Sequence, residues 1–106
     1  MSAFKKREQS MEAKFARDGE LAFQARIQAF RFIAGWAAQL KDDALSGERE
    51  LVQELIREGL RSPGNDRTIA VLSNYLGDLA DEALLHRKLE EFMRDATAVV
   101  GLARAS

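Results

Sequence analysis

Cysteine is absent from this chain of 106 residues, which excludes disulfide bonds, thiolate metal sites and cysteine nucleophiles. No stretch reaches the roughly 18 consecutive apolar residues of a membrane-spanning helix. The 16 basic residues do not outnumber the 17 acidic ones, and the net charge of -1 argues against a nucleic-acid-binding protein, which normally carries a basic excess. A basic cluster at Lys5 to Arg7 has no apolar run behind it, so we expect no secretory signal and a cytoplasmic protein.

The residues that are present favour a folded, helical protein. Apolar residues make up 46% and charged residues 31% of the chain, so a buried interior is expected rather than disorder. The length fits one domain. Strict alternation of apolar and polar residues never persists, whereas helical spacing dominates. The sequence therefore predicts an all-α protein, a small four-helix bundle.

Four segments show this helical spacing: residues 20–40, 47–60, 67–76 and 82–100. The first has the widest apolar arc, so we expect it to lie centrally and to be covered by the others. Its predicted inward residues are Phe23, Ala29, Ile27, Phe30, Ile33, Ala34, Trp36, Ala37 and Leu40. Those of the other three are Leu51, Val52, Leu55, Ile56, Leu60, Ile69, Leu72, Tyr75, Leu76, Leu84, Leu85, Leu89, Phe92, Met93, Ala96, Val99 and Val100.

Capping residues mark the predicted helix ends. Ser46, Asn65 or Asp66, and Asp81 are candidate N-caps, because their side chains can accept a hydrogen bond from an unpaired backbone amide. Gly77 suits a left-handed C-terminal cap, in which φ is positive. We expect residues 101–106 to fray.

Residues 1–18 differ from the rest of the chain. They are rich in charge, and their large apolar residues are few. Gly19 then interrupts the pattern, so we predict a mobile, helix-prone N-terminal arm at 1–18 and a bundle at 19–106. Composition leaves two interpretations open: a terminal helix or disordered tail, and a helix that folds against a partner.

Candidate catalytic groups are few. His86 is the only histidine and is expected on the surface, since one histidine without a second ligand makes a poor metal site. The adjacent carboxylates do not face each other on a helix and are expected to be solvated. They are Asp42 with Asp43 and Glu90 with Glu91. We expect no enzyme activity, no metal and no cofactor.

The segment from Pro63 to Asp66 precedes a helix N-terminus, which could in principle accept an anion. Turn formation explains it more simply, and Asp66 would repel a phosphate. The helix-turn-helix pattern over 50–76 offers only Arg67 as a base on its second helix, which argues against DNA binding.

Two motifs at matching spacing resemble a known family. They are Phe4, Arg7-Glu8, Glu12-Ala13-Lys14-Phe15-Ala16, Asp18, Glu20-Leu21 and Phe23, followed by Gly35-Trp36-Ala37-Ala38. Together they resemble the inhibitor subunit zeta of the F-type ATP synthase of alphaproteobacteria. The turn at 63–66 and the segment 87–91 resemble the second half of that family more loosely, so that the resemblance covers nearly the whole chain.

The resemblance implies a four-helix bundle whose N-terminal arm enters a catalytic interface of the rotary ATPase, folds there as a helix and blocks rotation. It implies a protein that is monomeric when free, binds the catalytic head, does not insert into the membrane and is peripheral to the inner membrane when bound. The arm residues that it implies are Phe4, Arg7, Glu8, Glu12, Ala13, Lys14, Phe15, Ala16 and Asp18. Phe15 would supply apolar anchoring, and Arg7, Glu8, Glu12 and Lys14 would form charge pairs.

The chain departs from the family pattern at Lys5 and Lys6, where acidic residues are expected. Two other functions stay open on the sequence: a non-inhibitory helical protein-interaction module, and a bundle that binds a small ligand or nucleotide.

Overall fold

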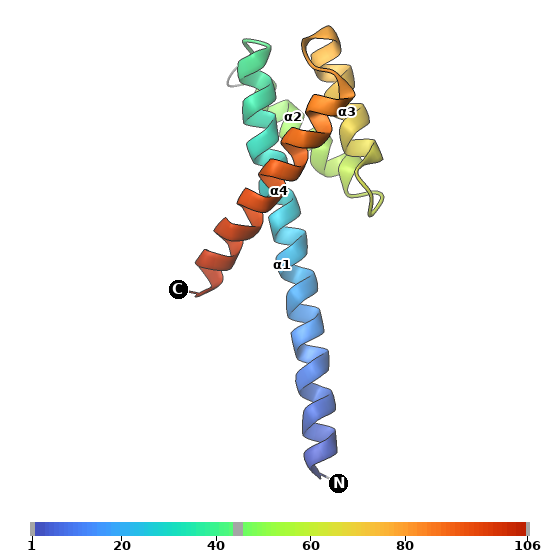
Figure 1. Ribbon diagram of the computed structural model, residues 1–106, viewed down its shortest axis with the longest axis vertical. Helices are drawn as coiled ribbons and strands as arrows, with labels where there is room; N and C mark the ends of the chain where they lie inside the picture. The colour runs from blue at the N-terminus through green and yellow to red at the C-terminus, as the bar shows by residue number, and fades with distance from the viewer. Residues whose placement is uncertain (1, 44–45, 106) are drawn as a thin grey trace.

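The computed structural model describes the backbone of residues 2–43 and 46–105, and the side chains of residues 19–43 and 46–102. Within these ranges it contains four α-helices and no strand, as the sequence predicts (Figure 1). A short 3₁₀ turn, η1 (Gly77–Leu79), joins the third helix to the fourth. The helices are α1 (Ser2–Leu40), α2 (Ser46–Gly59), α3 (Asp66–Leu76) and α4 (Glu82–Ala105).

Helix α1 is the central element, as predicted. Its C-terminal half packs chiefly against α4 and α2, while α3 closes the bundle against α2 and α4. Its N-terminal half continues beyond the other helices, and the protein measures 62 × 28 × 21 Å (Figure 1). The largest fully buried apolar side chains are Phe30, Ile33, Leu51, Leu55, Leu72, Leu85 and Leu89.

Two predicted helix ends are wrong. Helix α1 starts at Ser2 and runs through Gly19 without a break, although the sequence predicts a first bundle helix that starts at Glu20. Helix α4 continues past Gly101 to Ala105, where fraying is predicted. One glycine costs a helix only about 1 kcal/mol. The good helix formers on both sides outweigh that cost, so a lone glycine does not end either helix.

Some of the predicted helix caps are confirmed and others are not. The Oδ1 of Asp81 accepts a hydrogen bond of 2.8 Å from the amide of Leu84, which confirms this N-cap. Gly77 ends α3 with the positive φ that was predicted, 54°, but its ψ of -124° differs from that of a left-handed helical cap. Asn65 occupies the N-cap position of α3, but its side chain makes no capping hydrogen bond. Ser46 is itself the first residue of α2.

Most of the predicted core is buried or half-buried, with three exceptions. Phe23, Leu40 and Val99 are exposed. Leu40 is the last residue of α1, where the chain turns away. Phe23 precedes Ala25, the first buried residue in the described part of α1, and Val99 follows Ala96, the last buried residue in that of α4, so both lie beyond the part of their helix that the bundle covers.

A polar contact joins the turn that follows α1 to helix α3. The hydroxyl of Tyr75 donates a hydrogen bond of 3.2 Å to Oδ2 of Asp43, and the ammonium of Lys41 lies 4.2 Å from the centre of the Tyr75 ring. Burial, followed by the hydrogen bond and negative charge of Asp43, raises the pKa of Tyr75 above its ordinary value. The folded protein therefore keeps this proton to higher pH than the unfolded chain does.

We expect the folding stability that this contact contributes to be lost as the pH rises above about 10, where the unfolded chain begins to release the phenolic proton. Phenolate absorbance can follow the titration directly, because Tyr75 is the only tyrosine. The substitution Asp43→Asn should lower the pKa of Tyr75 toward its ordinary value. A pKa that is the same in both proteins would contradict the contact.

Candidate partner-binding site

The arm residues predicted from the sequence all belong to the N-terminal half of α1. The backbone there is helical, over nearly five turns at about 3.6 residues per turn. The side chains of Phe4, Arg7, Glu8, Glu12, Ala13, Lys14, Phe15, Ala16 and Asp18 lie outside the described residues. Their contacts and roles therefore stay predictions.

The described part of the site is the root of this helix, which is held firmly in the bundle. Phe30, Ile33, Ala34 and Ala37 of α1 have at most 1% of their surface exposed and belong to the main core with residues of α2, α3 and α4. The C-terminal half of α1 is therefore held by all three of the other helices.

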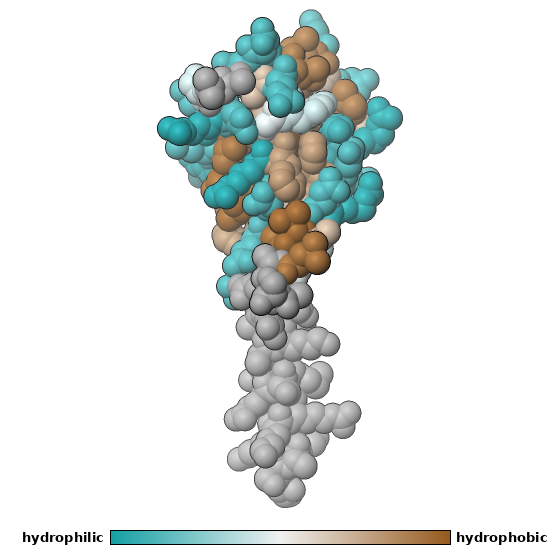
Figure 2. Space-filling view, turned by 90° about the vertical axis from the view of Figure 1, so that its left-hand side faces the viewer, coloured by the Kyte–Doolittle hydropathy of each residue, from teal (hydrophilic) through white to brown (hydrophobic). Residues whose placement is uncertain are grey.

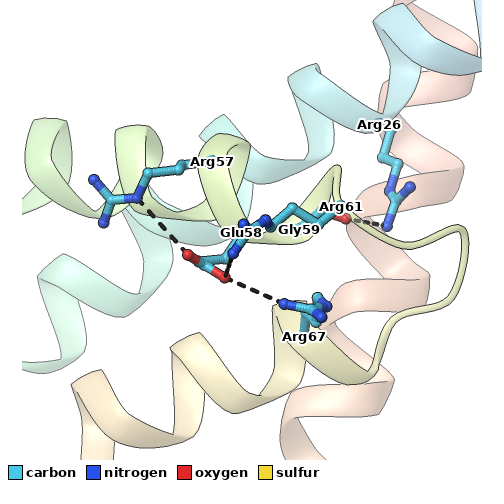
Figure 3. A network of polar contacts seen from close by, with 6 residues as sticks. All are labelled: Arg26, Arg57, Glu58, Gly59, Arg61 and Arg67. Atoms are coloured by element: carbon cyan, nitrogen blue, oxygen red, sulfur yellow. Dashed lines mark hydrogen bonds and ion pairs between the residues drawn. The ribbon is translucent and has the colours of Figure 1, made fainter.

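Arg26 of α1 makes a set of polar contacts, here called the Arg26 tie, with the end of α2 and the turn that follows it. Its Nη2 donates to the backbone carbonyl oxygens of Gly59, Ser62 and Gly64, at 2.6, 2.9 and 2.9 Å (the first contact is drawn in Figure 3). These carbonyls lie at the end of α2 and in the following turn, where helical partners are missing. A cation also suits the negative end of the α2 dipole. One side chain of α1 thus caps α2 and fixes the α2–α3 turn.

The guanidinium of Arg26 also lies 5.7 Å from the centre of the Phe30 ring, one turn along α1. Gly59 makes this packing possible. A Cβ at Gly59 would stand 2.8 Å from Cζ of Phe30 and 2.9 Å from Oγ1 of Thr68, which is too close for either atom. The absence of a side chain at Gly59 therefore lets α1 approach the end of α2.

Beside this tie, Glu58 lies between three arginines (Figure 3). Its carboxylate oxygens are 3.9 Å from Nε of Arg57, 3.6 Å from Nη1 of Arg61 and 3.5 Å from Nη1 of Arg67. All three arginine side chains are at least half exposed, so each pair contributes little to stability. We interpret the cluster as surface structure around the α2–α3 turn.

The second motif, residues 35–38, has a structural explanation. Ala37 and Ala38 are fully buried. A Cβ at Gly35 would lie 3.1 Å from Oε1 of Glu48, so a side chain there would require the end of the Glu48 side chain to move slightly. The ring of half-buried Trp36 has the ammonium of Lys88 at 5.6 Å from its centre. The motif therefore positions α1 against α2 and α4.

Helices α1 and α4 form a fork at the root of the arm. Ala25, Ala29 and Ala96 pack together where the two helices cross, since their small side chains allow close approach. Beyond this crossing the helices diverge and leave a hollow of about 270 Å³. It is lined by Leu21, Ala22, Ala25, Thr97, Val100 and Gly101.

The other groups singled out in the sequence are dispersed. His86 is exposed on α4, as predicted, and so are Glu90 and Glu91. Asp42 is also exposed, but Asp43 is half-buried and accepts the hydrogen bond from Tyr75, so its predicted full solvation is wrong. Among the described residues, no group of three or more acidic, histidine or cysteine side chains could hold a metal ion. No helix in the same part of the chain has the length and apolarity to span a membrane.

Sequence reasoning missed Arg26. Nothing in the pattern marks it, because its partners are three backbone carbonyls 33 to 38 residues away. It also missed the fork, since helical spacing shows which face of a helix is apolar and not how far a neighbouring helix covers that face.

No curated protein and no solved structure matches the chain. A family model does match it: ATPase inhibitor subunit zeta, over residues 1–99. The match includes all of α1 with the predicted arm, and α2, α3 and most of α4. The chain therefore belongs to the ATPase inhibitor subunit zeta family.

Proposed function

We propose that this protein inhibits ATP hydrolysis by the F-type ATP synthase by inserting residues 1–18 into an interface of the catalytic head and blocking rotation. The observation that carries the proposal is the course of α1. This single helix is anchored in the bundle at its C-terminal half and extends beyond the other helices at its N-terminal half (Figure 1). Such an element suits a wedge that acts by occupying space, without catalysis, metal or cofactor.

Continuity with the bundle favours this mode of binding on energetic grounds. Forming the first turn is the costly step of helix formation, whereas each further residue adds a hydrogen bond to an existing helix. The bundle already supplies that nucleus at residues 25–40. Folding the arm against a partner therefore costs less than folding a separate peptide of the same length.

The roles within the arm follow the family. Phe15 would provide the apolar anchor, helped by Phe4. Arg7, Glu8, Glu12 and Lys14 would form charge pairs across the interface and set its register. The bound protein would be peripheral to the membrane, and the unbound protein would be a monomer.

The test is the ATP hydrolysis rate of the purified catalytic head. We expect the full chain to lower this rate at saturating concentration, and a chain that lacks residues 1–18 to leave it unchanged, because the wedge is gone. Circular dichroism and thermal unfolding of the shortened chain provide the control for an intact bundle. A head that hydrolyses ATP at the same rate with and without saturating full chain would reject the proposal.

Single substitutions refine the test. Phe15→Ala and Glu12→Ala should each weaken inhibition by roughly tenfold or more, the usual effect of truncating an anchor or a paired charge in an interface. Arg31→Ala, at an exposed position of α1 beyond the arm, is the matched control. Equal inhibition by the unmodified chain and all three variants would show that Phe15 and Glu12 do not contribute to binding at the interface.

A further inference from the structure

Gly19 lies inside α1 at a position where the packing of the described residues does not require a glycine. It is exposed, and a Cβ built on it would have no described neighbour within 4 Å outside its own part of the helix. By contrast, Gly59 leaves room for the ring of Phe30, and Gly77 has a positive φ. Packing and backbone conformation therefore explain those two glycines and leave Gly19 unexplained.

Gly19 also lies close to the point where α1 extends beyond the bundle. Ala25, six residues later, is the first buried residue in the described part of α1. The residues between them are exposed or half-buried, and Figure 2 shows hydrophobic surface at this end of the bundle, where the described side chains begin. At position 19 the stability of the helix therefore depends on the local sequence rather than on packing against another helix.

A glycine at this place acts on the whole N-terminal half of α1. A helix that is anchored at one end extends residue by residue, and the propensity of each residue multiplies the ratio of helical to unfolded states beyond it. Glycine lowers this ratio about fivefold relative to alanine in a helix interior. Residues 2–18 lie on the far side of Gly19 from the bundle, so every state in which they continue the bundle helix carries this factor.

We propose that Gly19 is a weak point in α1, which lets the helix over residues 2–18 unfold while the bundle stays folded, and that it thereby sets the affinity of the arm for its partner. The second part rests on the proposed function, in which the arm binds as a helix. A partner that binds only the helical arm has its affinity reduced by the fraction of chains whose arm is helical. Inhibition is therefore weaker than it would be with a better helix former at this position.

The substitution Gly19→Ala, made in the full chain, tests the weak point. Gly101→Ala is the matched control, because Gly101 is also exposed, lies inside α4 and has open space where its Cβ would stand. The first readout is the helical fraction of residues 2–18 in the free chain, from their Cα chemical shifts. The second is the affinity for the purified catalytic head.

We expect Gly19→Ala to raise the ratio of helical to unfolded arm about fivefold, and the affinity by up to the same factor. Thermal unfolding of the bundle should not change, and Gly101→Ala should leave both readouts of the arm as they are. Ala22→Gly, at an exposed position about one turn nearer the bundle, should move both readouts the opposite way by a similar factor.

The double variant Gly19→Ala/Ala22→Gly keeps one glycine in this segment and should return both readouts to the values of the unmodified chain. This result distinguishes helix propensity from a direct contact between the new methyl group and the head. An unchanged helical ratio in Gly19→Ala, or a raised ratio with unchanged affinity, would overturn the inference. Weaker binding by Gly19→Ala would also overturn it, by showing that the arm must bend at Gly19 to bind.

The outcomes separate this inference from the proposed function. If the arm of Gly19→Ala gains helix but the unmodified chain neither binds nor inhibits the head, the weak point in α1 stands and the proposed function fails. If the unmodified chain inhibits the head and Gly19→Ala changes neither readout, the proposed function stands and the weak point fails.

Discussion

Replacing Phe30 with alanine is expected to remove about 4 kcal/mol of folding stability, because the substitution empties part of the main core. Phe30 is 1% exposed and lies beside Gly59 of α2. The glycine leaves no nearby Cβ to move into the space, so the substitution creates a cavity as well as losing buried apolar surface. A domain of this size has only about 5–15 kcal/mol in total, so much of the population would unfold on mild heating.

Urea denaturation measures this loss, and Phe23→Ala is the matched control. Phe23 is the same residue type on the same helix, two turns earlier, but it is exposed. Its truncation should change the free energy of unfolding by less than about 1 kcal/mol. A similar loss in both variants would contradict the packing of α1 against the end of α2.

Replacing Arg26 with methionine is the second large effect, with an expected loss of about 2 kcal/mol. Methionine keeps much of the aliphatic part of the side chain, so the loss reports the contacts of the guanidinium: the hydrogen bonds to the carbonyls of Gly59, Ser62 and Gly64 and the contact with the Phe30 ring. The Nη2 of Arg26 carries two hydrogens and faces three carbonyl oxygens, so at least one of these hydrogens is shared between two carbonyls. The carbonyls that lose their donor are part-buried or exposed, which is why we expect a moderate rather than an extreme cost.

Arg31→Met provides the control for Arg26, because it removes the same charge from an exposed position of α1. Its effect on unfolding should stay within about 0.5 kcal/mol. The loss at Arg26 should also persist in strong salt, since its acceptors are neutral carbonyls, whereas the ion pairs of Glu58 are screened. A loss at Arg26 that disappears in salt would show that general electrostatics, and not the tie to the α2–α3 turn, stabilises the fold.

The sequence by itself determined the class of the fold and most of its core. Apolar residues at helical spacing identified all four helices, and Leu51, Leu55, Leu72, Leu85 and Leu89 are buried as this spacing predicts. Local chemistry also placed the N-cap at Asp81 and the positive φ at Gly77. These features depend on residues close together in the chain, so periodicity and capping rules reach them. The motifs in residues 4–23 and 35–38 also resembled the ATPase inhibitor subunit zeta family, and the family model that matches residues 1–99 confirms this assignment.

Only the tertiary structure decided where helices stop covering one another. Phe23 and Val99 continue their apolar stripes but are exposed, because they lie beyond the last positions of α1 and α4 that the bundle buries, Ala25 and Ala96. The tie made by Arg26 depends on carbonyls more than thirty residues away. Spacing along one helix fixes which face is apolar, whereas the crossing angle of two helices and the reach of a long side chain depend on the whole packed assembly. For that reason the anchorage of α1 in the bundle and the divergence of α1 and α4 could not be predicted from the sequence.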